Sequence, residues 1–196
     1  MQKRIIESAD DFDAAIGKLV RRFAYVRRRN MRHFAMRFCE HFGLAEPPRN
    51  PFRILPEVFG IRLERACLPR TTPAEWIRVN GNYVVRYSAH RPHDQLALTL
   101  WHELAEIVFA NPRFPSRYTT DQECDLAMLF AVNVMLPEDY VRAAVEEIGH
   151  SADSDKTVNL AAGFGVSRTA MRVRLGELGL LPSRYGQRYR WIKVPV

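Results

Sequence analysis

The chain has no long apolar run and few cysteines. No stretch approaches the ~18 consecutive apolar residues that a membrane-spanning helix needs, so no membrane span is expected. Cys39, Cys67 and Cys124 are odd in number and widely spaced, which argues against a disulfide framework and for a reducing compartment. The first residues, Met1 to Glu7, lack the apolar centre of a signal peptide. A cytoplasmic protein is therefore expected.

Acidic residues are also in short supply. The chain has 22 acidic residues against 29 lysines and arginines, a net charge of +7, while its 47% hydrophobic content is that of a globular protein. The basic excess gathers between Lys18 and Arg37 and again from Arg168 to Lys193. A basic face is the usual footprint of phosphate binding, but a solvated helix face has the same composition.

The most informative stretch runs from Leu98 to Phe109, where apolar residues recur at three- and four-residue steps and predict one buried helical face. His102 and Glu106 are four residues apart, so they share a second face, and Glu103 lies between them. Two ligands on adjacent helical turns can converge on one metal ion, and a neighbouring carboxylate can reach a water bound to it. The zinc-peptidase motif is HExxH, whereas this chain reads HELAE.

The flanking segments indicate an α+β fold. A helix is expected from about Asp10 to Phe42, a half-buried strand over 61–66, and a hairpin in which Asn80-Gly81 joins two alternating strands. These strands predict a small three-stranded sheet directly before the central helix. An exposed edge of such a sheet can hold an extended peptide, which makes Tyr83, Val85 and Tyr87 candidate substrate-binding residues.

A second long helix is expected from about Thr120 to Met135, and it would have to supply a third metal ligand. Glu123 and Cys124 lie on the arc expected to face inward, whereas Asp125 points roughly 200° away from Glu123 at about 100° per residue. Both Glu123 and Cys124 stay open as ligands, and a buried free cysteine is also common as simple core packing.

Further along, Val158 to Leu175 has the helix, glycine-containing turn and second helix of a helix-turn-helix, with Ser167 placed to cap the second helix. Arg168, Arg172 and Arg174 would then be candidate DNA contacts. The same segment can equally be a helix pair that packs on the body of the protein.

Four features in order along the chain resemble the ImmA/IrrE metallopeptidase-like proteins. They are the Pro47-Pro48 loop followed by Gly60-Ile61, the aromatic strand before Leu98-Thr-Leu-Trp-His-Glu-Leu, the ending Phe130-Ala-Val-Asn-Val-Met-Leu-Pro137, and Phe164-Gly-Val-Ser-Arg with its later Arg-Leu. The resemblance covers roughly residues 45–182. It implies a zincin-like fold and a cytoplasmic, zinc-dependent endopeptidase that acts on helix-turn-helix repressors controlling mobile elements or stress responses.

The resemblance also implies roles and departures. His102 and Glu103 stand at the family's first ligand and general base, Glu106 takes the place of the second histidine, and the family's downstream glutamate ligand falls on Cys124, with Glu123 one residue away. Three functions follow as alternatives: a zinc endopeptidase that uses this altered ligand set, a degenerate pseudopeptidase that binds a protein partner, and a DNA-binding regulator.

The expected organisation has three parts. Residues 1–45 form a basic helical segment, residues 46–150 a zincin-like core, and residues 151–196 a helix-turn-helix-like segment with a basic tail, packed on the core.

Overall fold

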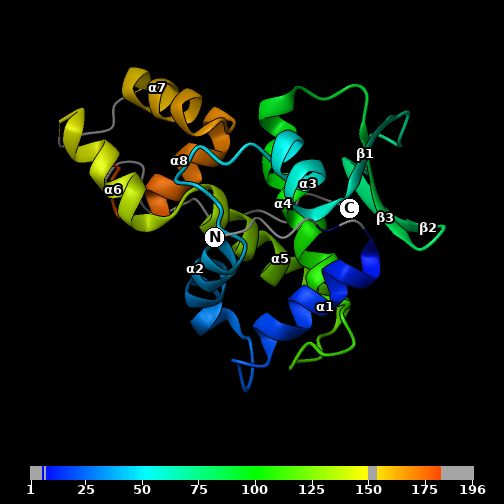
Figure 1. Ribbon diagram of the computed structural model, residues 1–196. Helices are drawn as coiled ribbons and strands as arrows, with labels where there is room; N and C mark the ends of the chain where they lie inside the picture. Colours follow the sequence, from blue (N-terminus) through cyan, green and yellow to red (C-terminus); the bar gives the residue numbers. More distant parts are fainter. Residues whose placement is uncertain (1–5, 7, 150–153, 182–196) are drawn as a thin grey trace.

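The computed structural model describes residue 6 and residues 8–149 and 154–181, and its fold is α+β as the sequence predicts. A small sheet lies at one end of the molecule, α7 and α8 lie at the other, and α4 and α5 run between them (Figure 1). The helices are α1 (Ala9–Val20), α2 (Met31–His41), α3 (Pro51–Phe59), α4 (His93–Phe109), α5 (Thr120–Met135), α6 (Glu138–Glu147), α7 (Ser154–Phe164) and α8 (Arg168–Glu177), with a short 3-10 turn η1 (Arg28–Asn30).

The sheet consists of β1 (Arg62–Ala66), β2 (Ala74–Val79) and β3 (Asn82–Ser88), in the spatial order β1-β3-β2. β2 and β3 form the predicted antiparallel hairpin, and its turn places Asn80 at φ 49° and Gly81 at φ 76°. Two central residues with positive φ give the turn the right-handed twist of the strands, which is why Asn-Gly suits it. β1 pairs with β3 in parallel, so β3 is the central strand and β1 and β2 are the edges.

Caps in the sequence set the ends of several helices. The side chain of Ser8 accepts a hydrogen bond from the backbone N–H of Asp11 at the start of α1, and Ser167 does the same for Ala170 at the start of α8. Thr119 and Gln122 form a reciprocal capping box that starts α5. These side chains satisfy backbone donors that the first helical turn leaves unpaired.

The core forms where α4 and α5 pack against each other, and aromatic rings from the N-terminal helices complete it. Trp101 of α4 is fully buried, and the ring of Phe59 meets it edge to face. The ring of Phe130 on α5 lies 5.0 Å from that of Phe38 on α2, and α1 contributes the fully buried Phe12. Burying so many aromatic side chains is the main favourable contribution to folding. The helices of residues 1–45 therefore pack into the same core as α4 and α5.

The expectation of a continuous helix from Asp10 to Phe42 is wrong. α1 ends at Val20, α2 begins at Met31, and the loop between them holds the buried residue Val26. The backbone N–H of Val26 donates to the hydroxyl of Ser116, and its carbonyl accepts from the hydroxyls of Ser116 and Tyr118. A contact more than 80 residues away in sequence thus satisfies the backbone groups that a helix would have paired internally.

The C-terminal helix pair packs on the core. Leu160 and Phe164 of α7 and Met171 and Leu175 of α8 belong to the main buried cluster. The basic tail over residues 182–196 lies outside the described residues. Among the described residues, no helix is both long enough and apolar enough to cross a membrane.

Candidate functional site

Two of the three polar residues of HELAE meet on the surface of α4. The Nε2 atom of His102 and the Oε1 atom of Glu106 are 3.1 Å apart, as expected for residues one helical turn apart. Their side chains are 12% and 29% exposed. The other ring nitrogen of His102, Nδ1, is buried and has no hydrogen-bond partner among the described residues. The imidazole is therefore held from one side only.

Glu103 faces the sheet rather than the solvent. Its residue is 7% exposed, and its carboxylate accepts a hydrogen bond from the backbone N–H of Trp76 on β2. Burial, with the nearby charges of Glu106 and Glu75, raises the pKa of Glu103 to about 8, and the Trp76 hydrogen bond offsets only part of that rise. This shift favours the protonated form of Glu103 near neutral pH, and the protonated form does not accept a proton from water.

On α5, Glu123 and Cys124 are both half-buried, whereas Asp125 is exposed. Burial and the charge of Glu106 raise the pKa of Glu123, so these two carboxyl groups lie within electrostatic reach of each other. Because Asp125 points outward, it belongs to the solvent-facing side of α5, as the helical periodicity predicts.

The zinc site that the resemblance implies can be tested against these donors. Two donors of one tetrahedral zinc ion, each at roughly 2.0 Å, lie roughly 3.3 Å apart, and the 3.1 Å between His102 and Glu106 is close to that separation. A third donor does not join them. Within the described ranges, no three His, Cys, Asp or Glu side chains are grouped so that they could hold a metal ion. As arranged, the donor set does not fit a catalytic zinc ion, which needs three protein ligands.

The candidate substrate residues lie on the central strand. Val85 is fully buried, Tyr83 donates its hydroxyl to Asp13 of α1, and the ring of Tyr87 packs edge to face on Phe52. Since β3 is paired on both sides, its backbone has no free edge for a peptide. The free edges belong to β1 and β2, and of these β2 contacts α4 and bonds to Glu103.

Sequence reasoning did not identify Glu75 and Trp76 as part of this site. Glu75 raises the pKa of Glu103 and also pairs with Arg86 at 2.7 Å, and Trp76 supplies the hydrogen bond to Glu103. The hairpin signal located both residues on a strand. It carried no information about which strand lies beside the helix, because that depends on the parallel pairing of β1 with β3.

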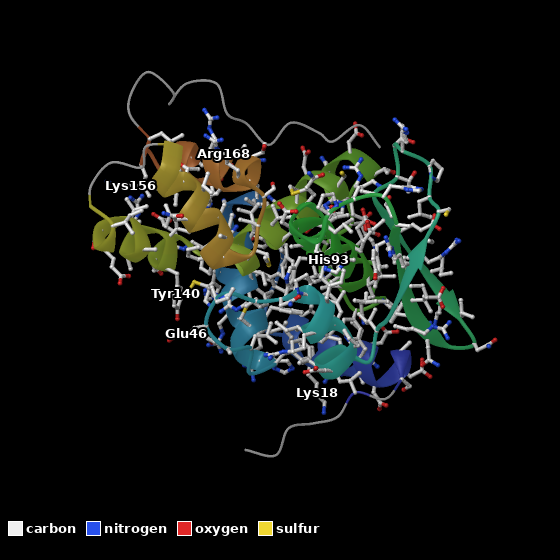
Figure 2. The ribbon with its side chains drawn as sticks, turned by 90° about the horizontal axis from the view of Figure 1, so that it is seen from above. Lys18, Glu46, His93, Tyr140, Lys156 and Arg168 are labelled. Atoms are coloured by element: carbon white, nitrogen blue, oxygen red, sulfur yellow. The ribbon has the colours of Figure 1, made fainter. Side chains whose placement is uncertain are left out.

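The three candidate DNA contacts on α8 differ in how exposed they are. Arg174 is 6% exposed, and its guanidinium donates to the carbonyl of Leu136. Arg172 is half-buried and Arg168 is exposed. Figure 2 shows Arg168 on the outer side of α8, pointing away from the core. Most of α8 therefore faces inward, and Arg174 holds this helix against the end of α5.

The first histidine of α4 serves as a ring contact. His93, labelled in Figure 2, begins the helix. Its ring stacks on that of Phe52 with 4.2 Å between the ring centroids. It lies nine residues, about two and a half turns, before His102, so the two side chains leave α4 on opposite sides.

Comparison with known proteins supports the fold and the family. A "Mycobacterium tuberculosis transcriptional regulator" superposes with a TM-score of 0.53 at 19% identity, covering 91% of this chain and 53% of that one. The chain thus spans about half the length of that regulator, and at this identity the similarity shows the fold alone. No curated protein matches the chain.

The family model of the IrrE N-terminal-like domain, Peptidase_M78, matches residues 57–176. That range includes the sheet, α4 with its HELAE motif, α5 and the C-terminal helix pair. It agrees with the resemblance drawn from the sequence motifs and with the zincin-like arrangement of a small sheet beside a His-Glu helix. The chain therefore belongs to the Peptidase_M78 family of IrrE N-terminal-like domains.

Proposed function

We propose that this protein is a metallopeptidase-like regulator that binds an extended segment of a partner protein beside α4 without cleaving it. The family is generally zinc-dependent. The proposal departs from that property because of one observation about this chain. Glu106 replaces the second histidine of HExxH and closes directly on His102 at 3.1 Å, while no third donor joins them within the described residues.

The state of Glu103 supports this proposal. A zinc peptidase of the HExxH type uses an ionised glutamate as its general base, whereas burial and neighbouring acids raise the pKa of Glu103 to about 8 and so favour its protonated form. Its hydrogen bond from Trp76 makes it a link between α4 and β2. In the proposal, Glu103 positions the edge strand instead of activating water.

The free edge of β2 supports the binding mode. An edge strand offers unpaired backbone groups, and an extended peptide can add to it as a further strand. The family resemblance suggests a helix-turn-helix repressor as the class of partner. The three cysteines are free thiols, which supports a cytoplasmic setting for this protein and its proposed partner.

A second candidate is the zinc endopeptidase in which His102 and Glu106 bind the metal with Glu123 or Cys124, and Glu103 is the catalytic base. The pKa of Glu123, raised in part by Glu106, favours it, because two nearby carboxyl groups would be stabilised by a cation between them. This candidate requires the side chains of α5 to move closer to α4 than the structure places them.

Metal content separates the two candidates. Untagged protein, loaded with one equivalent of zinc and desalted, is expected to retain less than about 0.1 equivalent, since two donors bind zinc weakly. The double variant Glu106→His/Cys124→Glu restores the family's ligand types and is expected to retain close to one equivalent. Glu106→Gln is the matched control and is expected to behave like the parent.

Near-stoichiometric zinc in the parent, lost in Glu106→Gln, would instead support the peptidase. A second measurement does not depend on metal loading. In a strain that lacks the gene, Glu103→Gln should restore the transcript profile as fully as the parent protein does, because Gln keeps the contact with Trp76. A Glu103→Gln profile that matches the deletion strain would contradict the non-cleaving proposal.

A further inference from the structure

Two loops at one edge of the molecule carry a dense set of exposed arginines. The loop that joins α1 to α2 and the loop that joins α4 to α5 lie side by side (Figure 1), tied by the hydrogen bonds of Val26 to Ser116 and Tyr118. We call their exposed arginines the arginine patch: Arg21, Arg22, Arg27, Arg28 and Arg29 on the first loop, and Arg113 and Arg117 on the second.

The described residues supply no carboxylate partner to the arginine patch. Within that part of the chain, none of its seven arginines forms an ion pair with an Asp or Glu side chain. Among the other described arginines, eight do form such pairs: Arg32, Arg37, Arg53, Arg62, Arg78, Arg86, Arg142 and Arg174. The patch holds seven of the chain's 29 lysines and arginines. A cluster of this size creates a local positive potential on this edge of the molecule.

An exposed aromatic ring lies inside the arginine patch. Tyr25 is 38% exposed, and the guanidinium carbons of Arg27 and Arg29 each lie 5.1 Å from its ring centroid. Arg29 also donates to the hydroxyl of Tyr25 at 2.6 Å. An aromatic ring flanked by guanidinium planes is a surface on which nucleic-acid bases stack.

The loops hold these groups in place before any ligand arrives. Asn30 accepts from the backbone N–H of Arg27 at 2.6 Å and donates to the carbonyl of Tyr25 at 2.9 Å. In the second loop, the guanidinium of Arg117 donates to the carbonyls of Phe114 and Pro112. A ligand that meets fixed charges loses less conformational entropy on binding than one that must order them.

We propose that the arginine patch binds single-stranded nucleic acid, with the arginines on backbone phosphates and a base stacked beside Tyr25. Unpaired guanidinium groups suit phosphates because their planar donors match two phosphate oxygens at once. The exposed ring favours a single strand over a duplex, whose bases are already stacked on each other. This surface lies away from the sheet and is independent of the function proposed for α4.

Fluorescence anisotropy with labelled 20-nucleotide dT and U strands tests the proposal on the full chain. Binding is expected at low salt, and a log–log salt slope of about −3 would correspond to about four phosphates. A 20-base-pair duplex is expected to bind more weakly, and the dT and U arms show whether the strand is DNA or RNA.

Matched variants locate the site. Arg27→Glu/Arg29→Glu and Arg53→Glu/Arg62→Glu lower the net charge by the same amount, but only the first pair lies in the patch. The first is expected to weaken binding at least about tenfold more than the second. Tyr25→Ala keeps every charge and is expected to weaken binding about 5- to 100-fold through lost stacking.

Three results would overturn the proposal. The first is no binding of either strand at low salt by protein whose circular dichroism is native. The second is equal weakening by the two charge-reversal pairs, which would reduce the effect to net charge. The third is tighter binding to a poly-glutamate peptide than to either oligonucleotide, which would assign the arginine patch to an acidic protein.

Discussion

Raising the pH from 4.5 to 8 is expected to lower the free energy of unfolding by up to about 4 kcal/mol through Glu103 alone. Its pKa is about 8 in the folded protein against an ordinary value of 4.5, chiefly because of burial. Between these values the folded state holds a proton that the unfolded state has lost, so stability falls as pH rises. The contribution is complete below pH 4.5 and is lost by the time pH passes 8.

Urea denaturation at several pH values measures this effect, and Glu103→Gln is the decisive variant. Gln stays neutral at all these pH values, so the variant should lack most of the slope and should exceed the parent in stability at pH 8. Glu57→Gln, an exposed residue of α3, is the matched control and should keep the parental slope. A slope that Glu103→Gln leaves unchanged would contradict the protonated, buried state of Glu103.

Replacing Arg174 with Ala is expected to lower the free energy of unfolding by about 3 kcal/mol. Arg174 is 6% exposed, and its Nε donates to the carbonyl of Leu136 at 3.0 Å while Nη1 lies 3.3 Å from Glu177. The truncation leaves that carbonyl without its donor and Glu177 without its cation. Chemical denaturation, followed by circular dichroism, measures the loss.

Arg142→Ala is the control for this prediction. Arg142 also bonds to a carbonyl, that of Leu178, and to a carboxylate, that of Glu138, but its side chain is 42% exposed. Replacing Arg142 with Ala is expected to lower the free energy of unfolding by less than about 1 kcal/mol. If Arg174→Ala kept parental stability but lost affinity for duplex DNA, α8 would be a recognition helix and the packed role would be wrong.

Elements with strong local signals were predicted well from the sequence. The bounds of α5 and the β2–β3 hairpin follow from residues close together in the chain, such as the capping pair Thr119 and Gln122 and the Asn80-Gly81 turn. The break between α1 and α2 was missed because it depends on Ser116 and Tyr118, which no local pattern connects to Val26.

The same division holds for the candidate site. The meeting of His102 and Glu106 follows from helical spacing alone, and the structure places them 3.1 Å apart. The contact of Glu103 with Trp76 depends on how the sheet docks on α4, so the sequence could not supply it. For the same reason, the roles assigned to Glu123 and Cys124 remain proposals, since the distance between two helices is a property of the assembled core.

One carboxylate of α1 has a consequence for how such domains recombine. Asp13 accepts from the hydroxyl of Tyr83 on the sheet and from the side chain of Asn111 after α4, and Phe12 beside it is fully buried. The family match begins only at residue 57. The segment that the family model matches is thus shorter than the unit that folds, although the structural similarity to the regulator covers 91% of the chain. A gene fusion cut at residue 57 would separate the core from the helices that close it.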